Sequence, residues 1–259
     1  MTPLDLDLPL RRLLPDCAET TVRGQVDSLD LVERVFPDRP YVITNFALTT
    51  DGHATISGRS GAIGSDADTA MLVGLRTRVD AVMIGAGTMR AERYGRVVGD
   101  PSKRQRRERH GLPHDPLFVI VSGRLELPWD APLFTEGHGR VLIATSSDED
   151  PPETATSVRV VRHPDGVDLA ALLSYLRKER GVRALLCEGG PRIHGQLVAG
   201  GLVDELFVTH APKIGGGVGP GLIAELEEGE RPLEVGWLLC EPGTGELFAR
   251  YLVTGSPAQ

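Results

Sequence analysis

Short apolar runs rich in strand-forming residues recur along the chain, and helical patterns separate several of them. The runs occupy residues 41–48, 81–85, 117–122, 141–145, 158–161, 184–187, 206–210, 233–239 and 247–253. Strands that alternate with helices are typical of a largely parallel sheet covered on both faces. Only residues 241–246 separate the last two runs, which therefore predict an antiparallel hairpin. We expect an α/β fold with a mostly parallel central sheet, helices on both faces and this hairpin at the C-terminal end.

Three segments between these runs have the caps and the apolar spacing of helices. Ser65 precedes a segment with apolar residues at helical spacing over 71–79, and a serine there is a preferred N-cap. Asp168 precedes a second such segment over 169–176, which ends in basic residues that favour a helix C-terminus. A third helix is expected over residues 193–199, ending at Gly200 and Gly201.

The first forty residues differ from the rest, because they are rich in leucine, interrupted by prolines and acidic. Residues 5–14 are compatible with a short amphipathic segment, and Ser28 is placed to cap a turn of helix over residues 29–35. We therefore expect residues 1–38 to form an extension that packs on a main domain of residues 39–256.

Composition excludes several function classes. The net charge of −8 disfavours a surface that binds nucleic acid or anionic lipid. Residues 103–110 (KRQRRERH) lack interleaved aromatics, and we expect a solvated surface loop there. The cysteines, Cys17, Cys187 and Cys240, are odd in number and form no CxxC pair, so neither a disulfide framework nor a metal site is indicated. With no signal peptide and no membrane-spanning run, a cytoplasmic location is expected.

Two glycine-bearing turns follow predicted strands. Gly85, Gly87 and Thr88 follow one, and Gly189 and Gly190 follow another. Glycines let the backbone approach a phosphate closely, and a helix that begins at Thr88 would add free N–H groups. Because ligands gather beyond the carboxyl ends of parallel strands, both turns point to one crevice. A tight turn without a ligand stays an open alternative for each.

A third glycine-rich segment begins at Thr49-Thr50-Asp51-Gly52 and continues through residues 58–65. An Asp-Gly pair after a strand is a turn signal. The loop that follows is longer and richer in glycine than a simple connection needs, which favours a loop that covers a ligand.

The order of these motifs resembles the pyrimidine reductases of riboflavin biosynthesis. Residues 45–52 (NFALTTDG) are similar to that family's SLDG segment. Further similar blocks are Gly64-Ser65, Leu75-Arg76, Asp80-Ala81, residues 85–88 with Glu92, residues 188–190, residues 201–205 and residues 211–216. The resemblance runs from about Pro40 to the end of the chain.

The resemblance implies the dihydrofolate reductase-like fold and the activity of 5-amino-6-(5-phosphoribosylamino)uracil reductase. In such an enzyme NADPH delivers hydride to C1′ of a phosphorylated ribosylamino-pyrimidine, and the protein positions the two molecules without a metal. Matched by motif, the residues expected at the cofactor are Ala47, Ile63, Gly87, Thr88, Glu92, Ser122, Gly189, Gly190, Pro191, Arg192, Ile193 and His194. Arg124, just beyond a predicted strand, is our candidate for the adenosine 2′-phosphate.

On the substrate side the resemblance implies Ser60, Arg76 and Glu188. Arg76 is expected to bind a phosphate, with Arg93 and Arg96 as further candidates, and Glu188 to accept hydrogen bonds from pyrimidine N–H groups. Asp51 and Glu188 are the candidate catalytic carboxylates, Asp51 as an orienting or proton-handling group.

Two departures from the family pattern bear on the substrate. Many members carry Asp-Asp-Pro where this chain has Glu92-Arg93-Tyr94, and many carry an N-terminal zinc deaminase domain whose motifs do not occur here. A dihydrofolate reductase-like enzyme acting on a pterin, and a non-catalytic NADPH-binding module, therefore remain alternatives. Family members pair through their sheets, which predicts a homodimer.

Overall fold

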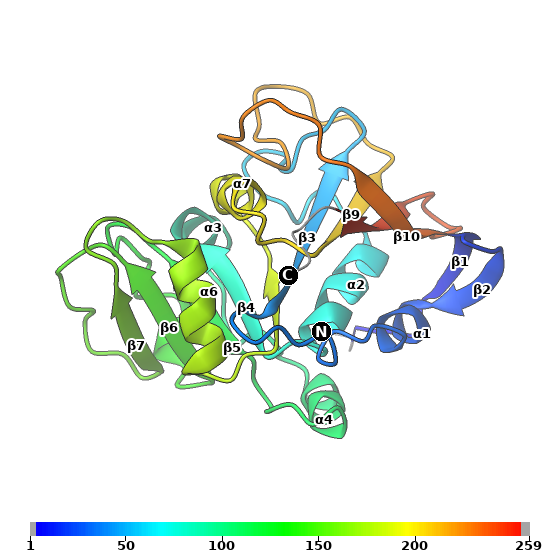
Figure 1. Cartoon of the computed structure of the whole chain (residues 1–259). Helices are drawn as coiled ribbons and strands as arrows, with labels where there is room; N and C mark the ends of the chain where they lie inside the picture. Colours follow the sequence, from blue (N-terminus) through cyan, green and yellow to red (C-terminus); the bar gives the residue numbers. More distant parts are fainter. Residues whose placement is uncertain (1–3, 255–259) are drawn as a thin grey trace. The chain divides into compact units, whose positions relative to one another are not determined.

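The computed structural model describes residues 4–254 and divides into two compact units. Among these residues, unit 1 comprises 4–30, 42–75 and 191–254, and unit 2 comprises 31–41 and 76–190. Figure 1 traces both along the chain.

Unit 2 contains a wholly parallel sheet in the strand order β8-β4-β5-β6-β7. The strands are β4 (Ala81–Gly85), β5 (Leu117–Val121), β6 (Arg140–Thr145), β7 (Ser157–Arg162) and β8 (Ala184–Cys187). The helices of this unit are α3 (Ala86–Glu92), α4 (Pro101–Arg109), α5 (Pro132–Thr135) and α6 (Leu169–Lys178). Strands β4, β5 and β8 are almost entirely buried, which explains why their sequences read as continuous apolar runs.

Unit 1 contains a mainly antiparallel sheet in the strand order β2-β1-β10-β11-β9-β3. The strands are β1 (Pro9–Leu14), β2 (Ala18–Thr21), β3 (Tyr41–Thr49), β9 (Glu205–Ala211), β10 (Leu233–Cys240) and β11 (Leu247–Val253). Only β3 and β9 are parallel neighbours among the described strands of this unit. The helices are α1 (Val22–Asp27), α2 (Asp66–Arg76) and α7 (Pro191–Ala199).

The expected α/β class, the nine strands and the C-terminal hairpin β10–β11 are confirmed. The two predicted caps are also present. The Ser65 hydroxyl accepts the Ala67 N–H at 3.1 Å, and the Asp168 carboxylate accepts the Ala171 N–H at 3.0 Å. The antiparallel part is larger than the hairpin, because β11 also pairs with β9 and β10 also pairs with β1.

The prediction of a helix that begins at Ser28 was wrong. The N-terminal segment forms the β1–β2 hairpin and helix α1, and Ser28 is the C-cap of α1 rather than the N-cap of a later helix. Thr21 takes the N-cap position, since its extended backbone lets its hydroxyl accept the Gly24 N–H at 3.0 Å. Leu29 and Leu31 are buried, as an apolar pattern indicates, but they are not helical.

The prediction of a solvated loop over residues 103–110 was also wrong, because helix α4 covers most of it. Asp100 caps the helix by accepting the Ser102 N–H at 2.8 Å, and Pro101 occupies the first turn. Arg107 is fully buried and donates to the carbonyls of Val79 at 2.9 Å and Pro113 at 2.8 Å, and to that of Arg76. Burial lowers the pKa of Arg107 to about 10, so it stays charged at neutral pH.

Candidate functional site

The two glycine turns of unit 2 are hydrogen-bonded to each other. The Gly85 N–H donates to the Gly189 carbonyl at 2.9 Å, beyond the carboxyl ends of the parallel neighbours β4 and β8. Gly189 has φ +114°, a conformation that favours glycine, and the Gly189–Gly190 peptide is cis. A Cβ on Gly190 would lie 3.3 Å from Thr88 Oγ1. The turns therefore form a narrow cradle of backbone in which a side chain at position 190 would crowd Thr88.

Helix α3 begins at Ala86, two residues before the expected start at Thr88. Its N-cap is Gly85, which offers no side-chain acceptor to the first N–H groups of the helix. The backbone after β4 therefore turns into the helix at once, with Gly87 exposed and Thr88 half-buried in its first turn.

Glu188 and Arg76 form a buried, bidentate ion pair. Arg76 Nε donates to Glu188 Oε1 and Nη2 donates to Oε2, both at 2.6 Å, and the side chains are 13% and 3% exposed. Burial opposes the charge on Arg76, but the neighbouring Glu188 carboxylate outweighs it and raises the pKa of the guanidinium. A third Arg76 nitrogen, Nη1, donates to the Val97 carbonyl at 3.1 Å.

Tyr94 completes the surroundings of Glu188. Its hydroxyl donates to Glu188 Oε2 at 3.2 Å, and its ring centroid lies 5.5 Å from that of Phe118. Burial, and next the negative charge of Glu188, raise the pKa of Tyr94, so the hydroxyl keeps its proton and acts as a donor. Sequence reasoning missed this role, although Tyr94 stands at a position where this chain departs from the family pattern.

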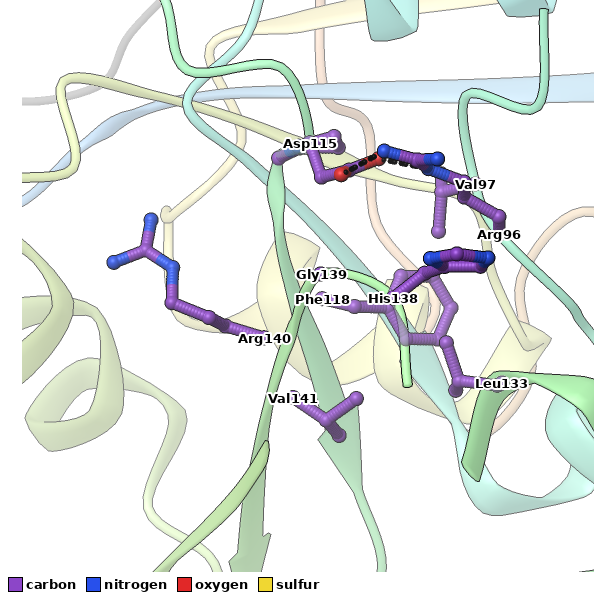
Figure 2. A pocket seen from close by; sticks show the side chains of 10 residues that line it. Arg96, Val97, Asp115, Phe118, Leu133, His138, Gly139, Arg140 and Val141 are labelled. Atoms are coloured by element: carbon purple, nitrogen blue, oxygen red, sulfur yellow. Dashed lines mark hydrogen bonds and ion pairs between the residues drawn. The ribbon is translucent and has the colours of Figure 1, made fainter. Parts of the chain in front are cut away.

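The other arginines expected at the substrate have different partners. Arg96 forms a bidentate pair with Asp115, with nitrogen–oxygen distances of 2.8 and 2.6 Å. This pair lies beside a cavity of about 10 Å³ where β5 and β6 begin, a space close to that of one water molecule (Figure 2). Arg93 has a left-handed backbone after α3, with φ +47°, and it reaches Asp130 at 2.7 Å.

The remaining cofactor candidates of unit 2 follow α3 and β5. Glu92 is the last residue of α3 and is half-buried. Ser122 is buried, and its N–H donates to the Ala144 carbonyl at 2.9 Å. Arg124 is 83% exposed and lies 3.4 Å from Glu126, so its guanidinium is open to solvent.

In unit 1 the Asp51 carboxylate holds two segments together. It accepts the Thr49 hydroxyl at 2.6 Å and the N–H groups of Gly215 and Gly216 at 2.9 and 2.8 Å, and His53 Nδ1 lies 3.2 Å away. The Thr49 hydroxyl, followed by these two backbone groups, holds the pKa of Asp51 far below its usual range. Asp51 is therefore ionised at neutral pH and already occupied by the protein's own donors.

His194, expected at the cofactor phosphates, has its side chain inside unit 1. It is 0% exposed, its ring stacks on Phe46 with centroids 4.6 Å apart, and Nδ1 lies 3.2 Å from the Leu222 carbonyl. Burial lowers the pKa of His194 to about 4, so the ring is neutral. Its backbone lies in the first turn of α7, next to the free N–H groups at the helix N-terminus that favour an anion.

The other candidates of unit 1 differ in exposure. Ile63 is 0% exposed, Ala47 is half-buried in β3, and Ser60 is exposed in the loop before α2. Pro191, Arg192 and Ile193 open helix α7, where the Arg192 side chain is 79% exposed and pairs with Glu225 at 2.7 Å. The first turn of this helix therefore presents one exposed cation.

Within residues 4–254, no group of three or more histidine, cysteine, aspartate or glutamate side chains is arranged to hold a metal ion. The cysteines at positions 17, 187 and 240 are free thiols. No helix in the same part of the chain is long and apolar enough to cross a membrane.

Residues 40–234 match the family described as the RibD C-terminal domain. A 2,5-diamino-6-ribosylamino-4(3H)-pyrimidinone 5′-phosphate reductase of Archaeoglobus fulgidus is 32% identical, over 69% of this chain and 83% of its own. A reductase of the same name from Methanothermobacter thermautotrophicus is 33% identical, over 69% of this chain and 81% of its own. RibD of Bacillus amyloliquefaciens is 30% identical, but this chain covers only 49% of it.

Among solved structures, a pyrimidine reductase-like protein of Corynebacterium diphtheriae has a TM-score of 0.74 and 25% identity. The match covers 90% of this chain and 99% of that one. This likeness agrees with the fold class expected from the sequence.

Proposed function

The chain belongs to the RibD C-terminal domain family, and from that premise we propose that it is an NADPH-dependent reductase acting on a 6-ribosylamino-pyrimidine 5′-phosphate. The reaction moves hydride to C1′ of the ribose and breaks the bond between C1′ and the ring oxygen. A proton from solvent on that oxygen completes the open ribityl chain. Two relatives named for such a reductase share about a third of their residues with this chain, over four fifths of their own length.

The observation that carries the proposal is the buried Glu188 carboxylate directly before the Gly189–Gly190 turn. Arg76 already compensates its charge, so Glu188 suits a neutral N–H donor better than a cation. A carboxylate offers about four acceptor positions. Arg76 and Tyr94 occupy three, and the remaining one, on Oε1, is suited to an amino or ring N–H of a pyrimidine.

This geometry changes the role we assign to Arg76. Binding a phosphate would require Arg76 to leave a buried carboxylate, and removing one partner of a buried pair costs about 3–5 kcal/mol. We therefore propose that Arg76 orients Glu188, while Arg93 remains a phosphate candidate and Arg96 stays paired with Asp115. Ser60 is kept as a substrate contact on the resemblance alone.

Asp51 is proposed as a positioning carboxylate rather than a proton carrier. A group whose pKa lies far below neutrality is a poor general acid, and Thr49, Gly215 and Gly216 already occupy three of its about four acceptor positions. It fixes the turn after β3 against the glycine-rich segment after β9.

The reductase family uses a nicotinamide cofactor, which supplies the hydride when bound, and we propose that this cofactor is NADPH. A side chain at position 190 would crowd Thr88, so the turn keeps its backbone uncovered. This supports a role for the turn in binding a ligand's phosphates through the backbone. In unit 2 we assign Gly87, Thr88, Glu92, Ser122, Arg124, Gly189 and Gly190 to the cofactor. In unit 1 we assign Ala47, Ile63, Pro191, Arg192, Ile193 and the backbone of His194.

We further propose that the enzyme works in the cytoplasm as a homodimer, with no nucleic acid or membrane partner. Residues 1–38 are proposed as an extension to a reductase domain of residues 39–256. The family match over residues 40–234 supports the start of that domain.

Steady-state oxidation of NADPH tests the function. The purified chain is offered the 2,5-diamino-pyrimidinone form of the substrate, its 5-amino-uracil form and dihydrofolate, each at several concentrations. Saturable oxidation with one of the two ribosylamino-pyrimidine phosphates is expected. Turnover of dihydrofolate alone would instead assign the chain to pterin chemistry.

A further inference from the structure

Unit 1 contains two carboxyl groups in its interior that none of the roles above uses. Asp68 lies in the first turn of α2, and Glu246 lies directly before β11 and is 1% exposed. Oδ1 of Asp68 is shielded from solvent and accepts no hydrogen bond from any residue in 4–254. A buried carboxylate oxygen without a donor is costly when the group is ionised. Asp68 is therefore suited to hold a proton.

Both carboxyl groups contact the end of the glycine-rich segment of residues 58–65. The Ser65 hydroxyl, which caps α2, donates to Oε2 of Glu246. A Cβ on Gly64 would overlap Oδ2 of Asp68, so the backbone of the segment packs directly against this carboxyl group. The two acids therefore link the segment to α2 and to the turn between β10 and β11.

The charges around these two acids do not balance. The other groups that face Asp68 are Thr209 on β9 and Lys213 beyond β9. The Lys213 ammonium donates to the carbonyls of Ala62 and Ile63, at 3.1 and 2.6 Å, near the end of the same segment. With both carboxyl groups ionised, the cluster has two negative charges and one positive charge. One bound proton removes the excess.

The surroundings of Asp68 move its titration towards neutral pH. Burial raises the pKa of Asp68 to about 6, and the charge of Glu246 adds to the shift, whereas Thr209 and Lys213 oppose it. A carboxyl group with a raised pKa stabilises the folded arrangement fully below its ordinary value of 3.8. That stabilisation is lost as the pH rises through about 6. The cluster therefore changes its charge in the mildly acidic range.

We propose that Asp68 and Glu246 form a pH switch for the segment of residues 58–65. With one proton bound, the end of the segment stays packed on the two carboxyl groups and is fixed to α2 and the β10–β11 turn. With both groups ionised, their repulsion and the unpaired Asp68 oxygen favour release of the segment.

Hydrogen exchange of backbone amides, followed by mass spectrometry, tests the switch without turnover. Protection factors, corrected for the intrinsic effect of pH on exchange, are compared at about pH 5 and about pH 7.5 for peptides that cover residues 58–65. In the wild type, protection of this segment should fall about tenfold between the two pH values. A fall of that size follows when the pKa of Asp68 is 3.8 in the released segment and about 6 in the packed one.

Variants assign the effect to the two carboxyl groups. Asp68→Asn keeps the shape of the side chain without its charge, so protection should be the same at both pH values. Glu246→Gln removes the excess negative charge and should make the fall smaller. Asp66→Asn, at an exposed position on the same helix, is the matched control and should behave like the wild type.

A wild-type segment whose protection is equal at both pH values would overturn the proposal. The same holds if Asp68→Asn and Glu246→Gln both keep the wild-type fall. Because Ser60 lies in the segment, KM for the pyrimidine substrate should rise over the same pH range in the wild type and stay constant in Asp68→Asn. This consequence alone rests on the proposed function. Absence of turnover with a pH-dependent segment would count against the proposed function and not against the switch.

Discussion

Arg76→Met is the variant that tests the Glu188 pair most sharply. In this variant the Glu188 carboxylate, which is 3% exposed, loses its two hydrogen bonds from Arg76 at 2.6 Å. The hydrogen bond from the Tyr94 hydroxyl, at 3.2 Å, remains. Removing one partner of a buried ion pair costs about 3–5 kcal/mol. At about 2–4 °C per kcal/mol for a chain of this size, the melting temperature should fall by roughly 6–20 °C.

Two further variants separate stability from function. In Arg76→Met with Glu188→Leu, two buried charges become apolar groups, and most of the lost stability should return. Activity should not return, because the acceptor at Glu188 Oε1 is gone. Tyr94→Phe keeps the ring against Phe118 and loses one hydrogen bond, which should cost about 1 kcal/mol.

The assay is thermal and urea unfolding at neutral pH, followed by substrate kinetics on each variant that remains folded. NADPH affinity is measured in parallel and should change little, since neither residue is assigned to the cofactor. An unchanged unfolding free energy in Arg76→Met would refute the buried pair. A fully active double variant would refute the binding role of Glu188.

Four further predictions concern other parts of the molecule. The fold lowers the pKa of Asp51 from 3.8, so its ionised carboxylate stabilises the folded state fully above that pH and progressively less below it. Asp51→Asn should therefore be less stable than the wild type at pH 7. Urea titrations below pH 4 should show a smaller difference in unfolding free energy between the two. Arg107→Met leaves buried carbonyls unpaired and should cost about 3 kcal/mol or more in urea unfolding, whereas exposed Arg109→Ala should stay within about 0.5 kcal/mol. Arg124→Ala should weaken NADPH binding by about 1.5–3 kcal/mol in cofactor titrations and leave NADH unchanged; equal wild-type affinity for both cofactors would refute its role. Light scattering at micromolar concentration should give the mass of a dimer, and a monomer would contradict that proposal.

The strands were predictable because each is a short apolar run, and burial on both faces makes such runs continuous. β4 and β5 are examples, with nine of their ten residues buried. The helix caps were predictable for a similar reason, since Ser65 and Asp168 satisfy N–H groups two or three residues away. Hydrogen bonds between residues that are close in the sequence can therefore be predicted from the sequence.

The parts that could not be predicted depend on distant partners. Arg76 and Glu188 are 112 residues apart, and Asp51 and Gly215 are 164 apart. The resemblance to the family and the residue types therefore suggested ligand contacts for side chains that the fold pairs with protein groups. The buried basic helix α4 is a similar case. In the sequence Arg107 cannot be distinguished from a surface charge. Only the fold brings the carbonyls of Val79 and Pro113 to it.

The central claim is hydride transfer to a ribosylamino-pyrimidine, and isotope transfer tests it most directly. The chain is incubated with NADPH carrying deuterium at the transferable C4 position and with the 2,5-diamino-6-ribosylamino-4(3H)-pyrimidinone 5′-phosphate. Mass spectrometry and NMR of the product should locate one deuterium at C1′ of a ribityl chain. Unlabelled substrate recovered intact, with NADPH bound but not oxidised, would contradict the account.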